Sequence, residues 1–299
     1  MLHAALGSAR QTGQVELLTD ALRFAHGRFA VRGLSRATYV ETCAALEDAA
    51  AATLAADDRD HLRALFARCL SDPTDASPDA EVLGPLSAAY VDRLAHGDRA
   101  GAIDLVRRCV TDGMEIDDIL LDVLEPAQRE VGRRWALGLI SVAHEHFCTA
   151  VTQFVMTELY AELFSGHDSR RRLVAVHAPG SLHQLGLRMV VDVLESRNWS
   201  TTYVVDDVMV DALPGILAED QADLLLISAT MPSQIVEVSA MIRAVRQDPR
   251  TRDVKIVVGG RPFNLAPGLA GVVGADRWAS DARSAVEVCD ELVGADDHR

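Results

Sequence analysis

The spacing of apolar residues near the N-terminus predicts a helical domain over residues 1–75. Leu17, Leu18, Ala21, Leu22 and Ala25 recur at the three- and four-residue intervals of one helix face. The same spacing continues in two further groups: Tyr39, Cys43 and Leu46, and then Leu62, Leu65, Phe66 and Leu70. Ser35 stands where a capping hydroxyl is expected. Residues 71–81, rich in Pro, Asp and Ser and without an apolar period, are predicted to be a linker.

A second helical block is predicted over residues 82–165. Its apolar stripes are Leu83, Leu86, Tyr90, Val91 and Leu94; Ala102, Leu105, Val106, Cys109 and Val110; Ile116 through Val131; and Phe147 through Leu163. Asp98 and Ser141 are the expected N-caps of the second and fourth helices, and Pro126 is expected to kink or divide the third. Four helices with short connections predict an antiparallel four-helix bundle.

Beyond a second linker at 165–172 the pattern changes to short apolar strands that alternate with helices. Strands are predicted at 173–178, 201–205, 223–229, 254–260 and around Trp278, with helices at 182–197, 211–220, 233–247 and 281–293. This alternation predicts a flavodoxin-like, doubly wound, five-stranded parallel sheet over residues 171–299. The expected fold class is therefore α + α/β.

Composition and charge exclude several functions. The chain has 299 residues, 49% of them hydrophobic and only 5% aromatic, and a net charge of −15. Such an acidic surface repels phosphate backbones and anionic lipids, so neither nucleic acid nor a membrane is expected as a direct partner. The N-terminus lacks the pattern of a secretion signal, and the five cysteines are scattered, which together predict a cytoplasmic protein with reduced thiols.

Candidate chemistry gathers at the carboxyl ends of the predicted strands. His183 and Gly186 follow the first strand, Ser228 and Thr230 the third, and Gly259 and Gly260 the fourth. Each signal alone is weak, because a loop histidine is usually solvated and a Gly-Gly pair is usually a turn. Ligands of doubly wound sheets bind at this edge, so together the three signals indicate a slot for a cofactor tail.

The sequence H-x-x-G, followed by S-x-T and G-G, resembles the cobalamin-binding fold of methionine synthase and corrinoid proteins. The resemblance implies that His183 is the lower axial ligand of cobalt. It also implies that Ser228, Thr230, Gly259 and Gly260 line the tunnel for the nucleotide tail. Ser181 departs from the pattern, because corrinoid methyl carriers usually place Asp two residues before the ligand histidine.

Trp135, followed after nine residues by Glu145-His146, resembles the bundle motif of light-sensing cobalamin repressors. The resemblance implies that Trp135, Val142, Glu145 and His146 surround the adenosyl group of adenosylcobalamin. The alternative is that Trp135 belongs to the bundle core and that Glu145-His146 is a solvated helix start.

These resemblances predict a light sensor rather than an enzyme. Photolysis of the cobalt–carbon bond would change the bundle packing and the quaternary structure of a homo-oligomer. The output domain would be a separate protein or lie outside this chain. Ala136 stands where the repressors carry the histidine that captures cobalt after illumination, so His144, His146 or water would take that role. The alternatives are a corrinoid carrier of a methyltransferase system and a scaffold that binds no cofactor.

Residues 25–49 loosely resemble the last helices of a globin. A degenerate globin joined to a cobalamin module resembles photocobilins, which implies biliverdin as a second chromophore. His26 is then the nearest candidate for the proximal position, and Arg23, Arg28, Arg32 and Arg36 are candidates for pairing with propionates. A helical dimerisation domain explains the same residues equally well.

Overall fold

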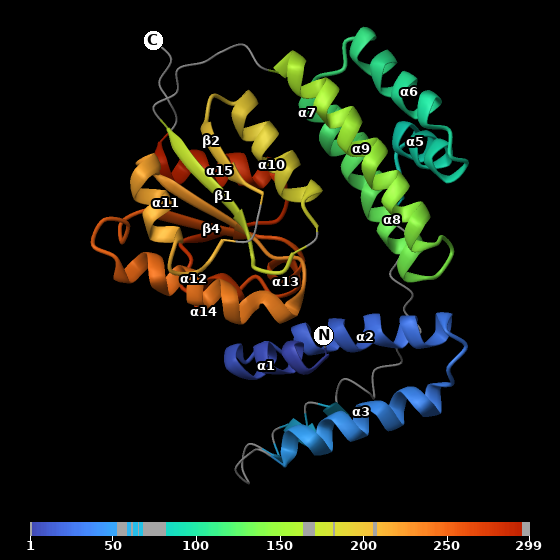
Figure 1. The fold of residues 1–299 in the computed structure, drawn as a ribbon, viewed down its shortest axis with the longest axis vertical. Coiled ribbons are helices and arrows are strands. Elements are labelled where there is room, and N and C mark those ends of the chain that lie inside the picture. Colours follow the sequence, from blue (N-terminus) through green and yellow to red (C-terminus); the bar gives the residue numbers. More distant parts are fainter. Residues whose placement is uncertain are drawn as a thin grey trace.

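A five-stranded parallel sheet forms the C-terminal half of the chain, in the order β2-β1-β3-β4-β5 (Figure 1). The computed structural model describes residues 2–52, 59–60, 62–64, 66–67, 82–163, 171–181, 183–205 and 208–294. The strands are β1 (Arg172–His177), β2 (Ser200–Val204), β3 (Leu224–Ser228), β4 (Lys255–Gly259) and β5 (Arg277–Ala279). All five predicted strands are confirmed. The connection from β1 leads to β2 on one side of it, whereas β3, β4 and β5 follow on the other side. The strand order therefore switches direction between β1 and β3, and ligands of such sheets bind at this switch point.

Helices cover both faces of the sheet because its strands are apolar on both sides. Val174 and Val176 pack into one cluster, whereas Leu173 and Ala175 pack into another. Helices α10 (Leu185–Ser196) and α15 (Ala282–Val293) cover the second cluster, and α11 (Leu213–Asp220), α12 (Ile235–Gln247) and α14 (Leu269–Val273) cover the first. The short elements η2 (Pro232–Gln234) and α13 (Arg261–Leu265) complete this part. Helices α13 and α14 were not predicted, because five residues are too few to show a helical period.

A region of packed helices, here called the helical region, precedes the sheet. It consists of α5 (Pro85–Ala95), α6 (Arg99–Thr111), α7 (Ile116–Asp118), η1 (Ile119–Leu124), α8 (Glu125–Ala136) and α9 (Val142–Leu163). Asp98 and Ser141 accept hydrogen bonds from the backbone amides of Gly101 and His144, as predicted. The third predicted helix continues through Pro126, with a π-helical stretch, η1, immediately before it. A π turn is one way to accommodate the amide that proline lacks.

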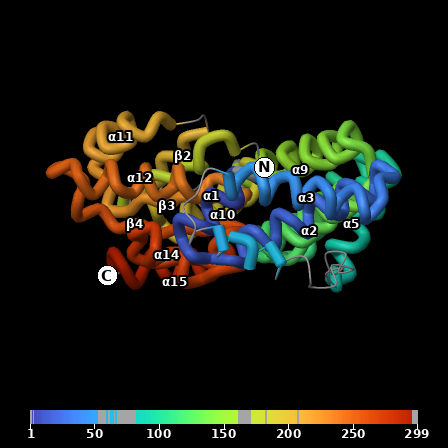
Figure 2. Tube along the Cα trace, turned by 90° about the horizontal axis from the view of Figure 1, so that it is seen from below, coloured from blue at the N-terminus to red at the C-terminus, as the bar shows by residue number. Residues whose placement is uncertain are grey.

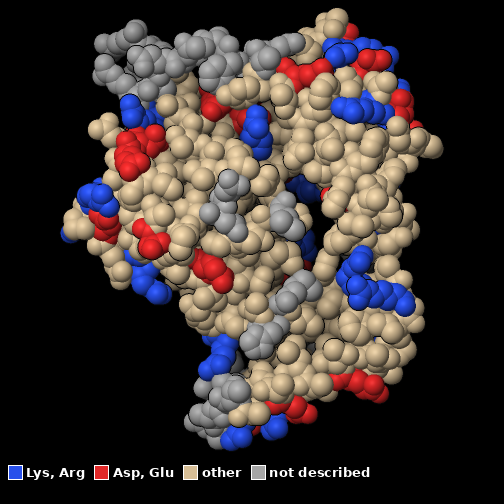
Figure 3. Space-filling view, in the orientation of Figure 1, with Lys and Arg blue, Asp and Glu red and all other residues tan. Residues whose placement is uncertain are grey.

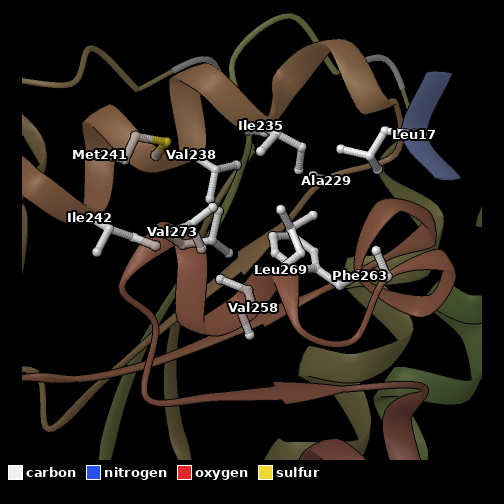
Figure 4. Close-up of a cluster of buried hydrophobic side chains, with 14 of the residues drawn as sticks. Leu17, Ala229, Ile235, Val238, Met241, Ile242, Val258, Phe263, Leu269 and Val273 are labelled. Atoms are coloured by element: carbon white, nitrogen blue, oxygen red, sulfur yellow. The ribbon is translucent and has the colours of Figure 1, made fainter. Parts of the chain in front are cut away.

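The N-terminal helices α1 (Leu2–Thr12), α2 (Val15–Val31) and α3 (Arg36–Ala51) lie below the sheet and the helical region in Figure 1, and Figure 2 shows the molecule from their side. Ser35 caps α3 by accepting a hydrogen bond from the Thr38 amide. Leu17 and Leu18 of α2 share a hydrophobic cluster with Ile235 and Phe263 of the sheet domain. Figure 4 shows Leu17 beside Ala229 and Ile235. The N-terminal helices thus bury their apolar stripe against the sheet domain as well as against one another.

Several predictions lie outside the described residues: Leu65, Leu70, the linker at 71–81 and most of the linker at 165–172. Among the helices that the structure describes, none combines the length and apolarity needed to cross a bilayer.

Candidate functional site

A cavity of about 720 Å³ lies between the carboxyl edge of the sheet, helix α8 and helix α2. Its size is in the upper part of the range of small-molecule and cofactor sites. The space-filling view shows a hollow between the sheet domain and the helical region (Figure 3). The predicted residues that line the cavity are Trp135, His183, Gly186, Ser228, Thr230, Gly259 and Gly260, together with Ala136. The fold therefore brings together residues that lie up to 125 positions apart in the chain.

The row of strand ends explains why these residues meet. His177 is in register with Ser228, Ser228 with Gly259, and Gly259 with Ala279. The loops that follow β1, β3 and β4 consequently start at the same level of the sheet. His183 lies in the first of these loops and is exposed, and Gly186 follows in the first turn of α10.

Gln234, which was not predicted from the sequence, ties two of these loops together. Its side-chain oxygen accepts hydrogen bonds from the backbone amides of Thr230 and Met231, each at 2.9 Å. Its side-chain nitrogen donates to the carbonyl oxygen of Pro179 at 3.3 Å. Ser181 joins the same contact, with its hydroxyl 3.5 Å from that of Thr230. Nothing in the sequence marks Gln234, because its importance comes from neighbours that lie 55 positions away.

The three predicted glycines serve different purposes. Gly260 has φ +96°, and a Cβ there would lie 2.0 Å from the carbonyl oxygen of Ala229. Gly259 is also close to a neighbouring strand, with 3.3 Å from an added Cβ to the carbonyl oxygen of Ala279. An added Cβ at Gly186 meets nothing within 4 Å. Gly260 is thus required by the adjacent backbone, Gly259 is tightly packed against it, and Gly186 is the one of the three that has open space around its Cα.

Helix α8 forms the wall opposite the sheet edge. It contributes Trp135 and a run of paired charges. The carboxylate of Glu130, only 6% exposed, accepts hydrogen bonds from Arg133 at 2.6 and 2.9 Å and from Arg134 at 2.8 Å. Arg133 is the main cause of a lowered Glu130 pKa, and Arg134 adds to it. Glu125 and Arg129 pair one turn earlier, at 2.6 Å. The opposite charges within these ion pairs largely cancel, so the wall carries little net charge.

Four predicted residues are not among those lining this cavity: Ser181, and Val142, Glu145 and His146 at the start of α9. The side chain of Glu145 accepts a hydrogen bond from Thr149 at 2.9 Å and lies 3.5 Å from His146 Nε2. Val142 is 54% exposed. The contact of the three α9 residues with an adenosyl group remains a prediction.

Helix α2 supplies the third wall through Asp20, Ala21 and Phe24. The sequence indicated an apolar face on α2 but no part in the site. The nearby candidate His26 packs edge-on against Tyr39, with 4.9 Å between ring centroids.

The donor groups fit a metal that brings its own equatorial ligands. Within the described ranges no cluster of three or more His, Cys, Asp or Glu side chains is placed to hold a metal ion. The imidazole of His183 lines the cavity beside two hydroxyls and the open space at Gly186. Neutral imidazole suits a first-row transition metal in an axial position. A corrinoid, whose macrocycle provides four nitrogen ligands, matches this donor set better than a bare ion does.

Comparison with known proteins supports cobalamin binding by this chain. Residues 86–160 and 171–288 match two families that are each described as a B12 binding domain. A corrinoid protein of Desulfitobacterium hafniense is 21% identical over 71% of this chain and 98% of its own length. A dimethylamine corrinoid protein of Methanosarcina acetivorans is 25% identical over 60% of this chain and 83% of its own.

A solved structure supports the same fold. The monomethylamine corrinoid protein of Methanosarcina barkeri superposes with a TM-score of 0.61 at 20% identity, covering 68% of this chain and 96% of that one. The fold and site define a cobalamin-binding protein, and the two matched domains together span the helical region and the sheet domain. The relatives are corrinoid proteins, so the comparisons give this class but not the light-sensing subfamily expected from the Trp135 motif.

Proposed function

We propose that this chain is a corrinoid carrier of a methyltransferase system, the alternative raised by the sequence. The observation that carries the proposal is the cavity in which His183, Ser228 and Thr230 at the sheet edge lie opposite Trp135 of α8. The relatives support it, since one is a dimethylamine corrinoid protein and another a monomethylamine corrinoid protein.

The chain's residues have separate tasks in this proposal. His183 holds cobalt from the sheet side, and the Ser228 and Thr230 hydroxyls donate or accept hydrogen bonds beside the nucleotide tail. Trp135 excludes water from the opposite side. When bound, the corrinoid supplies a cobalt centre that accepts and releases a methyl group.

Ser181 sets this chain apart from the carriers that it resembles, because a hydroxyl stands where they place a carboxylate. A carboxylate that accepts a proton from a ligand histidine raises the basicity of the imidazole. Ser181 instead lies against the Thr230 hydroxyl. We therefore expect Ser181→Asp to strengthen the bond between His183 and cobalt.

Spectral titration with hydroxocobalamin and methylcobalamin tests the proposal. The unaltered chain is expected to retain the cofactor through gel filtration, with the spectrum of a histidine-ligated corrinoid. His183→Ala should lose that signature, whereas His96→Ala, an exposed histidine at the end of α5, should keep it. An unchanged spectrum in His183→Ala would exclude His183 as the ligand.

A second candidate is the light sensor, favoured by the place of Trp135 in the cavity wall, whereas Ala136 departs from the pattern of the light-sensing repressors. It requires adenosylcobalamin, a spectral change under green light and a change in oligomeric size. Retention of adenosylcobalamin with no change in size under illumination would argue against it. A bilin in the N-terminal helices is tested by far-red absorbance after biliverdin is added.

A further inference from the structure

Helix α2 lies outside both matched B12 binding domains, which begin at residues 86 and 171, yet it borders the proposed cofactor site. Asp20 and Ala21 are adjacent, Phe24 follows about one turn later, and all three line the cavity. The helix contacts both the sheet domain and α8, which form the other two walls. Helix α2 therefore bridges the sheet-domain wall and the α8 wall of the cavity.

One end of α2 is fixed firmly to the sheet domain. Leu17, Leu18 and Leu22 are at most 1% exposed and share a cluster with Ala229, Ile235 and Phe263. Figure 4 shows Leu17 directed into this group. Asp20, 12% exposed, forms a two-point ion pair with Arg261, which directly follows Gly260 at the end of β4; Arg261 Nε lies 3.0 Å from Asp20 Oδ2.

The other end of α2 rests on the helical region through Arg28. The guanidinium carbon of Arg28 lies 4.8 Å from the centroid of the Trp135 indole, which is a cation–π contact. Arg28 Nη1 also donates a hydrogen bond to the Trp135 carbonyl oxygen at 3.3 Å. That carbonyl belongs to the last turn of α8, where the helix dipole favours a cation. Phe24 approaches the same indole, with 6.2 Å between ring centroids.

Val31 adds a further contact between this end of α2 and the helical region. An added Cβ at Gly138, in the turn between α8 and α9, would lie 2.5 Å from Val31 Cγ1. Val31 nevertheless remains 41% exposed. The contacts between this end and the helical region are thus a partly exposed cation–π pair, a tilted pair of aromatic rings, one hydrogen bond and one half-covered valine. At the sheet end, by contrast, three leucines are fully buried.

We propose that α2 is a hinged third wall of the corrinoid site, fixed at Leu17 and released at Arg28. In the closed position Phe24 shields the cofactor from solvent and from a partner enzyme. Separation of Arg28 from Trp135 opens the cavity to the methyl donor or acceptor. The inference rests on the proposed corrinoid function and adds a means of regulating access.

Hydrogen exchange of the full-length chain tests the contact, using peptides from α2 and from the α8–α9 turn. Adding hydroxocobalamin is expected to slow exchange at least about threefold in residues 20–31, because the cofactor fills the space behind them. Arg28→Ala should speed exchange in that segment even without cofactor. Arg32→Ala, an exposed arginine just past the end of α2, is the matched control and should leave exchange unchanged.

Cyanide substitution at bound hydroxocobalamin tests the access itself. Arg28→Ala is expected to raise the rate about three- to tenfold, with Arg32→Ala equal to the unaltered chain. Equal rates in all three proteins, with the cofactor retained, would overturn the hinged wall and leave the proposed function standing. Failure of the unaltered chain to retain any cobalamin would remove the proposed function itself, and this inference with it.

Discussion

The carbonyl oxygen of Ala229 occupies the space where any side chain at position 260 would begin. An added Cβ on Gly260 would lie 2.0 Å from that oxygen, and φ at Gly260 is +96°. Strands β3 and β4 can therefore end side by side at the cavity only if residue 260 is glycine. This glycine acts on the site through the backbone rather than by direct approach to a ligand.

Gly260→Ala is expected to lower the free energy of unfolding by about 2–4 kcal/mol, because it combines a strained φ with a backbone collision. Urea denaturation measures the change. Gly271→Ala, in α14, is the matched control, since its Cβ meets nothing within 4 Å and its φ is not positive. A loss below about 0.5 kcal/mol at position 260 would show that the two strand ends can shift apart.

Gly186→Ala is expected to increase the free energy of unfolding and, at the same time, to weaken cobalamin binding. The residue lies in the first turn of α10 with open space around it, so alanine should raise the free energy of unfolding by about 0.5–1 kcal/mol. The added methyl group borders the cavity and should weaken cobalamin binding several-fold in a spectral titration. Gly215→Ala in α11 also meets nothing within 4 Å but lies away from the cavity, so it should leave affinity unchanged. Equal affinities in the two variants would place the cofactor away from Gly186.

Asp192 is expected to make stability depend on pH. It is 1% exposed between α10 and α9, and burial raises its pKa to about 6, although Arg188 at 2.8 Å opposes the shift. The ordinary value is 3.8, so between pH 4 and 6 the folded chain keeps a proton that the unfolded chain has lost. Its contribution to stability is therefore greatest at low pH, and up to about 3 kcal/mol is lost as pH rises through 6.

Asp192→Asn should remove the pH-dependent contribution of Asp192 to the free energy of unfolding. The free energy of unfolding of the variant, relative to the unaltered chain, should rise from pH 4 to pH 6 and stay level above that. Asp104→Asn, an aspartate that is 65% exposed, serves as control. A constant difference between Asp192→Asn and the unaltered chain across this range would mean that Asp192 ionises normally in the folded protein.

Arg283 of α15 joins the sheet domain to the helical region by pairing with Asp118 at 2.9 Å and with Asp122 at 3.0 Å. All three side chains are about half exposed, so Arg283→Ala should cost no more than about 1 kcal/mol. The cost should shrink as salt is raised, because salt screens exposed charges. Arg243→Ala, an arginine on α12 across the sheet, is the control. A loss that persists in high salt would indicate packing rather than charge.

The sequence was sufficient for the strands, most of the helices and their caps. Alternation of apolar strands with helices requires a parallel sheet, and a parallel sheet brings its carboxyl ends to one edge. His183, Ser228 and Gly259 could therefore be assigned to a common edge from the pattern of residues alone. The resemblance to corrinoid proteins then gave the cofactor class, which the matched domains support.

The faces that helices turn toward one another were decided only by the tertiary structure. Trp135 lines the cavity and Glu145, beyond the turn at 137–141, does not, so the predicted contact of Glu145 with an adenosyl group stays a prediction. The apolar stripe of α2 was visible in the sequence, whereas Phe24 and Asp20 beside it gave no sign of bordering the site. Helical periodicity fixes which residues share a face. The element against which that face packs depends on contacts between segments distant in the chain, so it cannot be predicted from the residues of the helix alone.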